Sequence, residues 1–453
     1  MKRRKFLRAA GISVAGALTV PYILPSGRLF ARTGSAMADH VVFVLYAGGV
    51  RQQESVLQRY LTDSQGYVGS DFEGNILYNM LDGASPALKI VYGTDPPGQP
   101  EGSQPIPAIL TDTLQTQGTL FREVNMRGGG GHYSGLNTGI TGNYGVGQGL
   151  KQRPIYPTIF EYVRKHLGVA ATKTWMIGNT SQQSSIPLLN YSEQAGYGRN
   201  YGANFLSPSV TFSDYGEDHL ANAKLYDPTN ELEPIDEMKQ FFDNSFNAEG
   251  GLVPGIQNTF EEKLQIKDFV KRTFEKQSAG TIYHAPVNDL SDVRTIGYTC
   301  EVLAEFQPTL TIVNMHAIDS FHTNFTNGLR AMHRCDHGIG HLWNFIQGPN
   351  SGMANNTIML IQPEIGRDLN PNPILDENDF RAYDHGNTEN TKRMFSMMVG
   401  PGVDANLVMG AEANPVGEAV DIVPTIADIL GIKGDVMGQG LLDGNAMSLF
   451  DRI

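Results

Sequence analysis

The chain has 453 residues, of which 40% are hydrophobic and 18% charged, and its formal net charge at pH 7 is −13. This composition is typical of a globular protein, and the length fits one large α/β domain or two smaller ones. The negative charge argues against a nucleic-acid partner, which needs a basic face, and against an anionic membrane surface. Two cysteines, Cys300 and Cys335, are too few for a disulfide framework; they either pair across two helices or remain buried free thiols.

The N-terminal segment has the pattern of an export signal. Lys2–Leu7 reads KRRKFL, a twin-arginine sequence, and a mildly apolar stretch rich in Gly and Ala follows over Ala9–Leu24. Ala36–Ala38 fits a small-residue cleavage site. We therefore predict that residues 1–38 are a twin-arginine signal peptide, read by the Tat translocation machinery, and that the protein works in the periplasm or outside the cell. Because a core strand is expected from His40, the signal is either cut close to the fold or kept as a tether.

The first predicted strand is His40–Tyr46, a continuous apolar run that is typical of a central parallel strand. It ends in the tight turn Ala47–Gly49, where a functional loop would begin. Ile109–Phe121 resembles a helix that leads into a short strand, Leu120–Val124.

Four consecutive glycines, Gly128–Gly131, stand directly before His132. Such a run lets the backbone come close to a ligand and present N–H groups to an anion. The alternative is a flexible surface loop.

The middle of the chain continues the alternation of helices and strands. Pro at the start and Gly at the end mark a helix from Pro157 to Gly168, and Trp175–Ile177 is the next expected strand. We predict an insertion over the sheet at about 181–290, because 181–255 is polar, rich in Tyr and Asn, and lacks strand alternation. Two helical patterns follow at Phe260–Lys276 and Leu290–Phe306.

The stretch with the strongest chemical signal follows the β-branched run Leu310–Val313, which predicts a buried parallel strand. His316, Asp319 and His322 come directly after it, where open α/β sheets place their active sites. An Asp and a His three residues apart could share one cation. The alternative is that Asp319 merely caps the following helix, Phe325–Ile346, and that His322 is an ordinary loop residue.

The last third contains two further polar segments. The predicted strand Thr357–Ile361 leads into Glu364–Arg367 (EIGR), and Asp384–Gly386 (DHG) follows a loop rich in Pro, Asn and Asp. Arg393–Val399 is another strand and Val420–Leu430 a closing helix. Short apolar strands alternating with helical patterns predict a three-layer αβα sandwich with a mostly parallel central sheet.

With these pieces in this order, the sequence resembles the alkaline phosphatase superfamily, on its sulfatase-like side and close to an exported bacterial branch. The resemblance covers most of residues 39–453 outside the insertion and implies a single alkaline-phosphatase-like domain. In that family two metal ions flank a Ser, Thr or modified-Cys nucleophile. By position, Asp319, His322 and His385 match the protein ligands of the first metal. Glu364 and Asp384 are further candidate ligands, and the expected cofactor is a divalent cation, Zn²⁺ first with Ca²⁺ or Mn²⁺ as alternatives, or none.

The sequence departs from the family at several points. The spacing of Asp319 and His322 is one residue shorter than the family's commoner pattern, and the Asp-His pair expected after Thr357–Ile361 is replaced by Pro363 and Glu364, which keep one carboxylate at best.

The acid expected at the end of the first strand falls at Ala47 or Arg51, neither of which binds a cation. The nucleophile position falls within Gly128–Gly131, and glycine offers no nucleophile. We expect this run to face the metal ligands with backbone N–H groups instead.

Other residues are candidates for the missing chemistry. His132 could act as a base or as a ligand, and Arg367 could bind an anionic oxygen in a bidentate manner; the alternative for Arg367 is a salt bridge to a neighbouring acid. Gly130, Gly131 and Ser134 are the candidate substrate-binding residues.

Two functions follow. The first is an exported metal-dependent hydrolase of phosphate or sulfate esters, with a reduced site that lacks the usual nucleophile and acts on an anionic small-molecule or glycan ester. The second is a non-catalytic relative that binds an anionic ligand or a partner in the cell envelope.

Overall fold

The computed structural model describes residues 35–60, 65, 73–86, 91–146, 153–179, 186–213, 216 and 256–453 in full, with the backbone of two short paired strands, β1 (Tyr22–Ile23) and β2 (Leu29–Phe30). The predicted signal at 1–38 lies almost wholly outside these residues and stays a prediction. Residues 217–255 of the insertion expected at about 181–290 also lie outside them, and the insertion stays a prediction.

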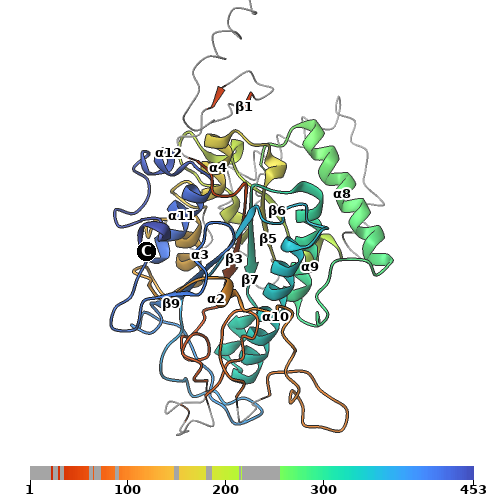
Figure 1. Ribbon diagram of the computed structural model, residues 1–453, viewed down its shortest axis with the longest axis vertical. Coiled ribbons are helices and arrows are strands. Elements are labelled where there is room, and N and C mark those ends of the chain that lie inside the picture. Colours follow the sequence, from red (N-terminus) through yellow and green to blue (C-terminus); the bar gives the residue numbers. More distant parts are fainter. Residues whose placement is uncertain are drawn as a thin grey trace, which may run out of the picture.

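An eight-stranded sheet runs through the middle of the molecule (Figure 1). Its strands, in spatial order, are β10 (Leu407–Met409), β4 (Gly118–Asn125), β9 (Arg393–Val399), β8 (Thr357–Pro363), β3 (His40–Tyr46), β7 (Leu310–Met315), β5 (Thr174–Gly178) and β6 (Asn204–Leu206). All neighbouring pairs are parallel except the two that β9 forms with β4 and β8. The predicted, mostly parallel sheet is therefore confirmed.

The three central strands end at the same level. Tyr46 of β3 lies between Met315 of β7 and Pro363 of β8 in the register. All three strands are almost wholly buried, since helices cover both faces and leave no side for polar alternation. The residues that follow Tyr46, Met315 and Pro363 consequently emerge together at one edge of the sheet.

Helices cover both faces of this sheet, which completes the αβα sandwich (Figure 1). On one face α9 (Ser291–Phe306) and α10 (Phe325–Gln347) pack on the alternate strand residues Val42, Val44 and Tyr46. On the other face α3 (His132–Thr141), α4 (Ile159–Leu167) and α11 (Ile422–Ile429) pack on Val41, Phe43 and Leu45. The period of two along β3 thus divides the core into two halves.

Helix α4 shows why its end signals could be recognised in the sequence. The Thr158 side chain accepts from the Glu161 N–H, and the Glu161 carboxylate accepts from the Thr158 N–H, which forms a capping box. At the other end Gly168 takes the left-handed conformation at φ 64°. The helix begins and ends within two residues of the predicted bounds.

The helix predicted over Ile109–Phe121 is wrong in its extent. The only helical turn there is α2 (Leu114–Gln117), and β4 begins at once with Gly118. The backbone N–H groups of Ile109 and Leu110 bond the Asn79 side chain instead of forming a helical turn. A contact across 30 residues therefore replaces the local helical bonds that the spacing of apolar residues suggests.

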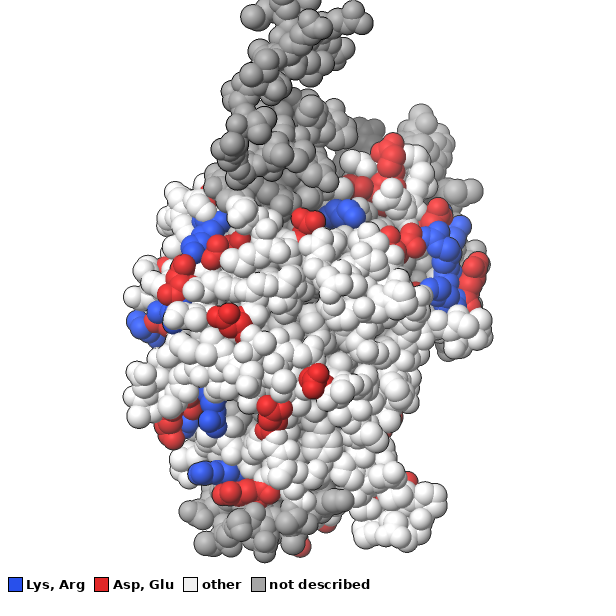
Figure 2. All heavy atoms as spheres, in the orientation of Figure 1, with Lys and Arg blue, Asp and Glu red and all other residues white. Residues whose placement is uncertain are grey.

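The described part of the insertion adds β6, α5 (Pro208–Thr211) and α8 (Phe260–Ser278), the last of which covers a small separate apolar cluster. Cys300 and Cys335 are both buried free thiols. None of the helices in the described ranges combines the length and the apolar character that a membrane crossing requires. On the face shown in Figure 2, the charged side chains of the described residues are interspersed rather than gathered by sign.

Candidate metal centre

Asp319 and His322 lie on one side of a short 3₁₀ helix, η6 (Ala317–His322), soon after β7. A 3₁₀ helix has three residues per turn, so residues three apart are eclipsed. The Asp319 Oδ1 and His322 Nε2 atoms are accordingly 3.2 Å apart. The buried carboxylate of Asp292 fixes this turn by accepting from the Ala317 N–H at 2.6 Å.

His132 is the first residue of α3 and reaches the same place from the other side of the centre. Its Nε2 lies 3.1 Å from Asp319 Oδ1, and its Nδ1 lies 2.6 Å from Oε1 of Glu364. Glu364 follows β8, is fully buried, and also accepts from the Gly48 N–H at 2.6 Å. The helix start is held close by Gly135, where a Cβ would lie 2.5 Å from the Glu364 carbonyl oxygen.

His385 completes the group from the loop between β8 and β9. Its Nε2 lies 2.9 Å from His132 Nε2 and 3.9 Å from Asp319 Oδ1. Its Nδ1 lies 2.7 Å from the Gly130 carbonyl oxygen. The backbone at Gly130 passes so close to the backbone at Gly386 that only glycine fits at 130, because a Cβ there would lie 1.6 Å from the Gly386 carbonyl oxygen.

One ligand atom from each of His132, Asp319, His322 and His385 lies within 4.8 Å of the other three. Four of the separations between these atoms, 2.9 to 3.9 Å, bracket the edge of about 3.3 Å in a tetrahedron with metal–ligand bonds of about 2.0 Å. The donor set therefore fits one cation that prefers nitrogen.

The three imidazoles share one tautomer. Each Nδ1 faces an atom that only accepts: a Glu364 oxygen, the Gly130 carbonyl and, at 2.7 Å, an Asp384 oxygen behind His322. Each Nδ1 then carries a proton, and in the neutral form of each ring the lone pair of Nε2 points towards Asp319. Either a second proton on His132, donated from Nε2 to Asp319 Oδ1 at 3.1 Å, or a metal ion offsets the repulsion between these lone pairs and the carboxylate oxygen. A hydrogen-bonded ring nitrogen behind each metal-binding nitrogen is the usual support of histidine ligands.

The charges of the centre also call for a cation. Although burial opposes the shift, the carboxylates of Glu364 and Asp319 raise the pKa of His132 to about 10. Burial and the nearby positive charges of His132 and Arg367 lower the pKa of His385 to about 4. Against burial, the bonds from His132 and His322 hold the pKa of Asp319 far below its usual value. The carboxylates of Asp319, Glu364 and Asp384 exceed the single guanidinium of Arg367, which leaves two negative charges when the imidazoles are neutral and one when His132 is protonated.

The predicted ligands divide into two groups in the structure. Asp319, His322 and His385 come together and are joined by His132, which the sequence left as a base or a ligand. Glu364 and Asp384 do not present oxygens to the common point; their oxygens bond the Nδ1 atoms of His132 and His322.

At Gly130 the structure differs from the expectation that the N–H groups of the glycine run face the ligands. The Gly130 N–H donates to Asn387 Oδ1 at 2.8 Å, and its carbonyl contacts His385. Gly131 is the N-cap of α3, and the Ser134 hydroxyl lies towards Gly128, 3.2 Å from where a Cβ would stand on that residue. The sequence did not indicate Asn387 as a residue that holds the glycine run, although it follows the DHG segment directly. His316, which followed the strand in the sequence, lies at the side of the centre, 3.6 Å from Asp319 Oδ2.

Arg367 does not reach outwards to bind an anion. Its guanidinium is fully buried and bonds the Gly48, Gly49 and Tyr383 carbonyls and Asp319. Arg51, at one of the positions where the family has an acid, pairs with Glu54 and stacks on the Tyr383 ring at 3.5 Å.

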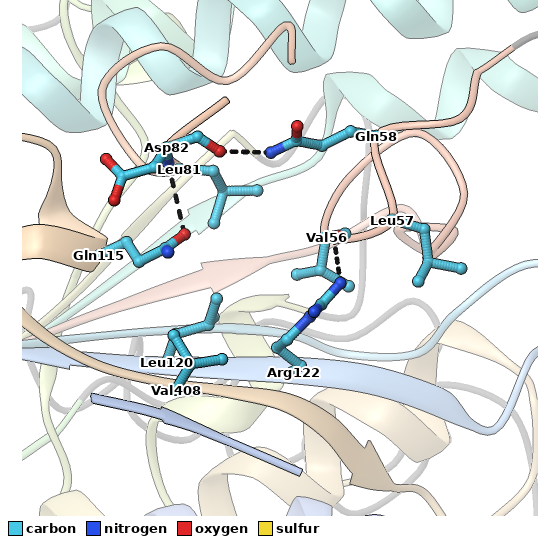
Figure 3. A pocket seen from close by; sticks show the side chains of 9 residues that line it. All are labelled: Val56, Leu57, Gln58, Leu81, Asp82, Gln115, Leu120, Arg122 and Val408. Carbon is cyan, nitrogen blue, oxygen red and sulfur yellow. Dashed lines mark hydrogen bonds between the residues drawn. The ribbon is translucent and has the colours of Figure 1, made fainter. Parts of the chain in front are cut away.

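A cavity of about 420 Å³ lies elsewhere, between the segment after β3 and the β4–β10 end of the sheet (Figure 3). Its walls include Val56, Leu81 and Leu120, with Asp82 and Arg122 among the polar groups. Arg122 donates to the Val56 carbonyl at 3.0 Å, as Figure 3 shows. None of the four converging residues lines this cavity.

No protein-family model matches the chain, and no curated protein matches it. Among solved structures the chain is similar to a protein of the alkaline phosphatase superfamily from Vibrio parahaemolyticus, with 11% identity, a TM-score of 0.38, and coverage of 95% of this chain and 76% of that one. It is similar to the sulfatase PsFucS1 from Pseudoalteromonas sp., with 13% identity, a TM-score of 0.43, and coverage of 92% and 72%. A third is the alkaline phosphatase of the Antarctic bacterium TAB5, with 10% identity, a TM-score of 0.38, and coverage of 87% and 98%.

At these identities and TM-scores the similarity says nothing of family or activity, and activity must be inferred from the residues of the centre.

Proposed function

We propose that this chain is an exported hydrolase of phosphate or sulfate esters that uses a single divalent metal ion held by His132, Asp319, His322 and His385. The observation that carries the proposal is the shared orientation of three imidazoles, each of which has Nδ1 on an acceptor and Nε2 turned towards one carboxylate oxygen. Three nitrogens and one oxygen favour Zn²⁺ over Ca²⁺ or Mg²⁺, which take oxygen ligands. When bound, such an ion supplies Lewis acidity to an ester oxygen or to a water molecule.

The protein's own residues would hold this centre and leave it open on one side. Glu364, Asp384 and the Gly130 carbonyl fix the imidazole rings, and Arg367 fixes Asp319. The side chains of His132, Asp319 and His322 are 25%, 26% and 31% exposed, so an ester can reach them. Helix α3 begins at His132 and points its N-terminus at the same place, which favours a negatively charged substrate.

The site would work without a covalent intermediate. The converging atoms are imidazole nitrogens and a carboxylate oxygen, and the place before α3 where a nucleophile would stand is glycine. A water molecule is then the attacking group, and the substrate is an anionic small-molecule or glycan ester. The twin-arginine sequence at Lys2–Leu7 supports work in the periplasm or outside the cell.

One observation favours a second function, a metal-dependent binding protein without turnover. Four protein ligands fill a tetrahedral ion completely, as in structural zinc sites, whereas catalytic sites keep one position open. The two functions differ in activity but share the metal.

Metal analysis of the purified full chain, together with an ester screen, tests both. We expect about one Zn²⁺ per chain, hydrolysis of 4-nitrophenyl phosphate or sulfate, and loss of both in Asp319→Asn. If the chain binds a metal but hydrolyses no ester, the second function, a binding protein, is supported and the first is refuted. If the chain binds no divalent metal, both functions are refuted.

A further inference from the structure

The guanidinium of Arg367 bonds four oxygen atoms, one of which belongs to the proposed metal ligand Asp319. Its Nε donates to the Gly49 carbonyl at 2.9 Å and its Nη1 to the Tyr383 carbonyl at 2.7 Å. Its Nη2 bonds Asp319 Oδ1 at 2.8 Å and also the Gly48 carbonyl. The side chain is fully buried, so these four oxygens are its environment in place of water.

These four oxygens belong to the segments that carry or support the metal ligands. Asp319 is a ligand itself, and Tyr383 precedes Asp384 and His385 in the chain. Gly48 donates its N–H to Glu364, the carboxylate behind His132. One guanidinium thus ties together three segments that are far apart in sequence, with separations of 16 to 319 residues along its bonds.

The turn after β3 is shaped around this side chain. Gly48 and Gly49 have φ values of 98° and 76°, which favour glycine. A Cβ on Gly49 would lie 3.2 Å from Arg367 Cγ and 3.4 Å from its Nε. The backbone therefore turns its two carbonyls towards the guanidinium at positions where a larger residue would crowd it.

A buried charge is costly unless it is paired and fully hydrogen-bonded. Here the positive charge neutralises part of the excess of carboxylates, and the planar fork of arginine bonds oxygens in several directions at once. The oxygens that surround it, three carbonyls and a carboxylate, are also the ligands that a second, oxygen-preferring cation would take.

We propose that the guanidinium of Arg367 is a permanent cation of the centre, which occupies an oxygen-lined place beside Asp319 and orients that carboxylate, so that the centre takes one metal ion and not two. Arg367 is then a positioning residue rather than an anion-binding one. This inference rests on the proposed metal site.

The test compares Zn²⁺ affinity and stoichiometry in the full chain with Arg367→Lys, Arg367→Ala and a matched control. Arg153 is a suitable control because its Nη1 also bonds oxygens of Leu188, Asn190 and Tyr191, and none of these belongs to the centre. Affinity is measured by competition with a chromophoric chelator, and folding of each metal-free variant by circular dichroism and thermal unfolding.

We expect one Zn²⁺ in the unaltered chain and unchanged Zn²⁺ affinity in Arg153→Ala, even where its unfolding temperature falls. Zn²⁺ affinity should fall by about 10- to 100-fold in Arg367→Ala, the range for residues that support metal ligands. Added guanidinium ion at low, non-denaturing concentration should restore part of it. Arg367→Lys keeps the charge and is expected to fold, with a loss of about 10-fold because one ammonium cannot bond all four oxygens.

Two bound Zn²⁺ ions in the unaltered chain, or undiminished Zn²⁺ affinity in folded Arg367→Lys, would overturn the inference. A failure of the proposed function looks different, because the unaltered chain itself would then bind no metal.

Discussion

Glu364 holds His132 by a bond of 2.6 Å between Oε1 and Nδ1, although 232 residues separate them in the chain. The carboxylate is fully buried, and its other oxygen has no hydrogen-bond partner among the described residues. In the proposed metal site, its function is to fix the ring of His132.

Glu364→Gln is expected to lower Zn²⁺ affinity by about 10- to 100-fold. The amide oxygen can still accept from His132, but it carries no charge and therefore supports the imidazole less strongly. Chelator competition measures the change. Glu161→Gln is the control, because Glu161 is equally buried and accepts from Thr158, Ser192 and Gly198 away from the centre. Equal affinities in the two variants would contradict a supporting role for Glu364.

Gly130→Ala is expected to destabilise the protein by roughly 2 kcal/mol or more, because a side chain there must displace the backbone at Gly386. It should also weaken Zn²⁺ binding, since the displaced backbone moves the carbonyl of residue 130 away from His385. Gly129→Ala is the matched control: a Cβ there lies 3.6 Å from the Ser134 hydroxyl, an ordinary contact. Its effect should stay within about 0.5 kcal/mol. Urea unfolding of both variants with a chelator present separates the steric cost from metal binding, and similar costs for the two would show that the Gly130–Gly386 contact can relax.

Local patterns in the sequence predict the strands and long helices well because each depends on neighbouring residues. The apolar run of β3 gives its bounds directly, and α10 follows from the spacing of its buried residues. The short α2 was not predictable in this way, because Asn79, 30 residues away, takes the N–H groups that a helix would need.

The centre was predictable in composition but not in arrangement. Asp319 and His322 follow a strand and are three residues apart in the chain. The 3₁₀ helix that contains them places residues three apart on the same side, so their side chains meet. Whether Glu364 and Asp384 bind the metal or support an imidazole depends on side-chain reach across the sheet edge, which residue type does not reveal. The fully enclosed guanidinium of Arg367 likewise depends on carbonyls at Gly48 and Tyr383 that carry no signal in the sequence.

His333, in α10 and away from the centre, should make stability depend on pH. Its Nδ1 donates to the Ile76 carbonyl at 2.7 Å and its Nε2 accepts from the Ile106 N–H at 2.8 Å, so only the neutral ring satisfies both bonds. Burial lowers the pKa of His333 to about 4 from the ordinary 6.5, although the Ile76 bond opposes the shift. The folded state resists protonation. Its stabilisation by neutral His333 is therefore complete above pH 6.5 and is lost as the pH falls towards 4.

The shift corresponds to roughly 3 kcal/mol over this range. His333→Gln should be less stable at pH 7 and should show a flatter decline between pH 6.5 and 4, measured by urea unfolding of the metal-free protein. His166→Gln, at the half-buried end of α4, should flatten the profile less, because burial lowers the pKa of His166 with less of the ring enclosed. A decline in His333→Gln as steep as in the unaltered chain would assign the pH dependence to other groups.

The last prediction concerns how an ester would be cleaved. If water attacks directly, no phosphoryl or sulfuryl group is transferred to the chain, and the first turnover shows no burst of released 4-nitrophenol. The structural reason is that the residues leading into α3 are glycines and that His132, at the first helical position, offers a ring nitrogen bonded within the centre instead of a hydroxyl. The experiment mixes the Zn²⁺-loaded chain with a slow 4-nitrophenyl ester, quenches it in acid, and measures the intact mass and then the peptides of 131–141. We expect an unmodified chain at every time point. A modified Ser134 or Thr138, formed and lost at the rate of turnover, would show that a hydroxyl of α3 is the nucleophile and that the proposed mechanism is wrong.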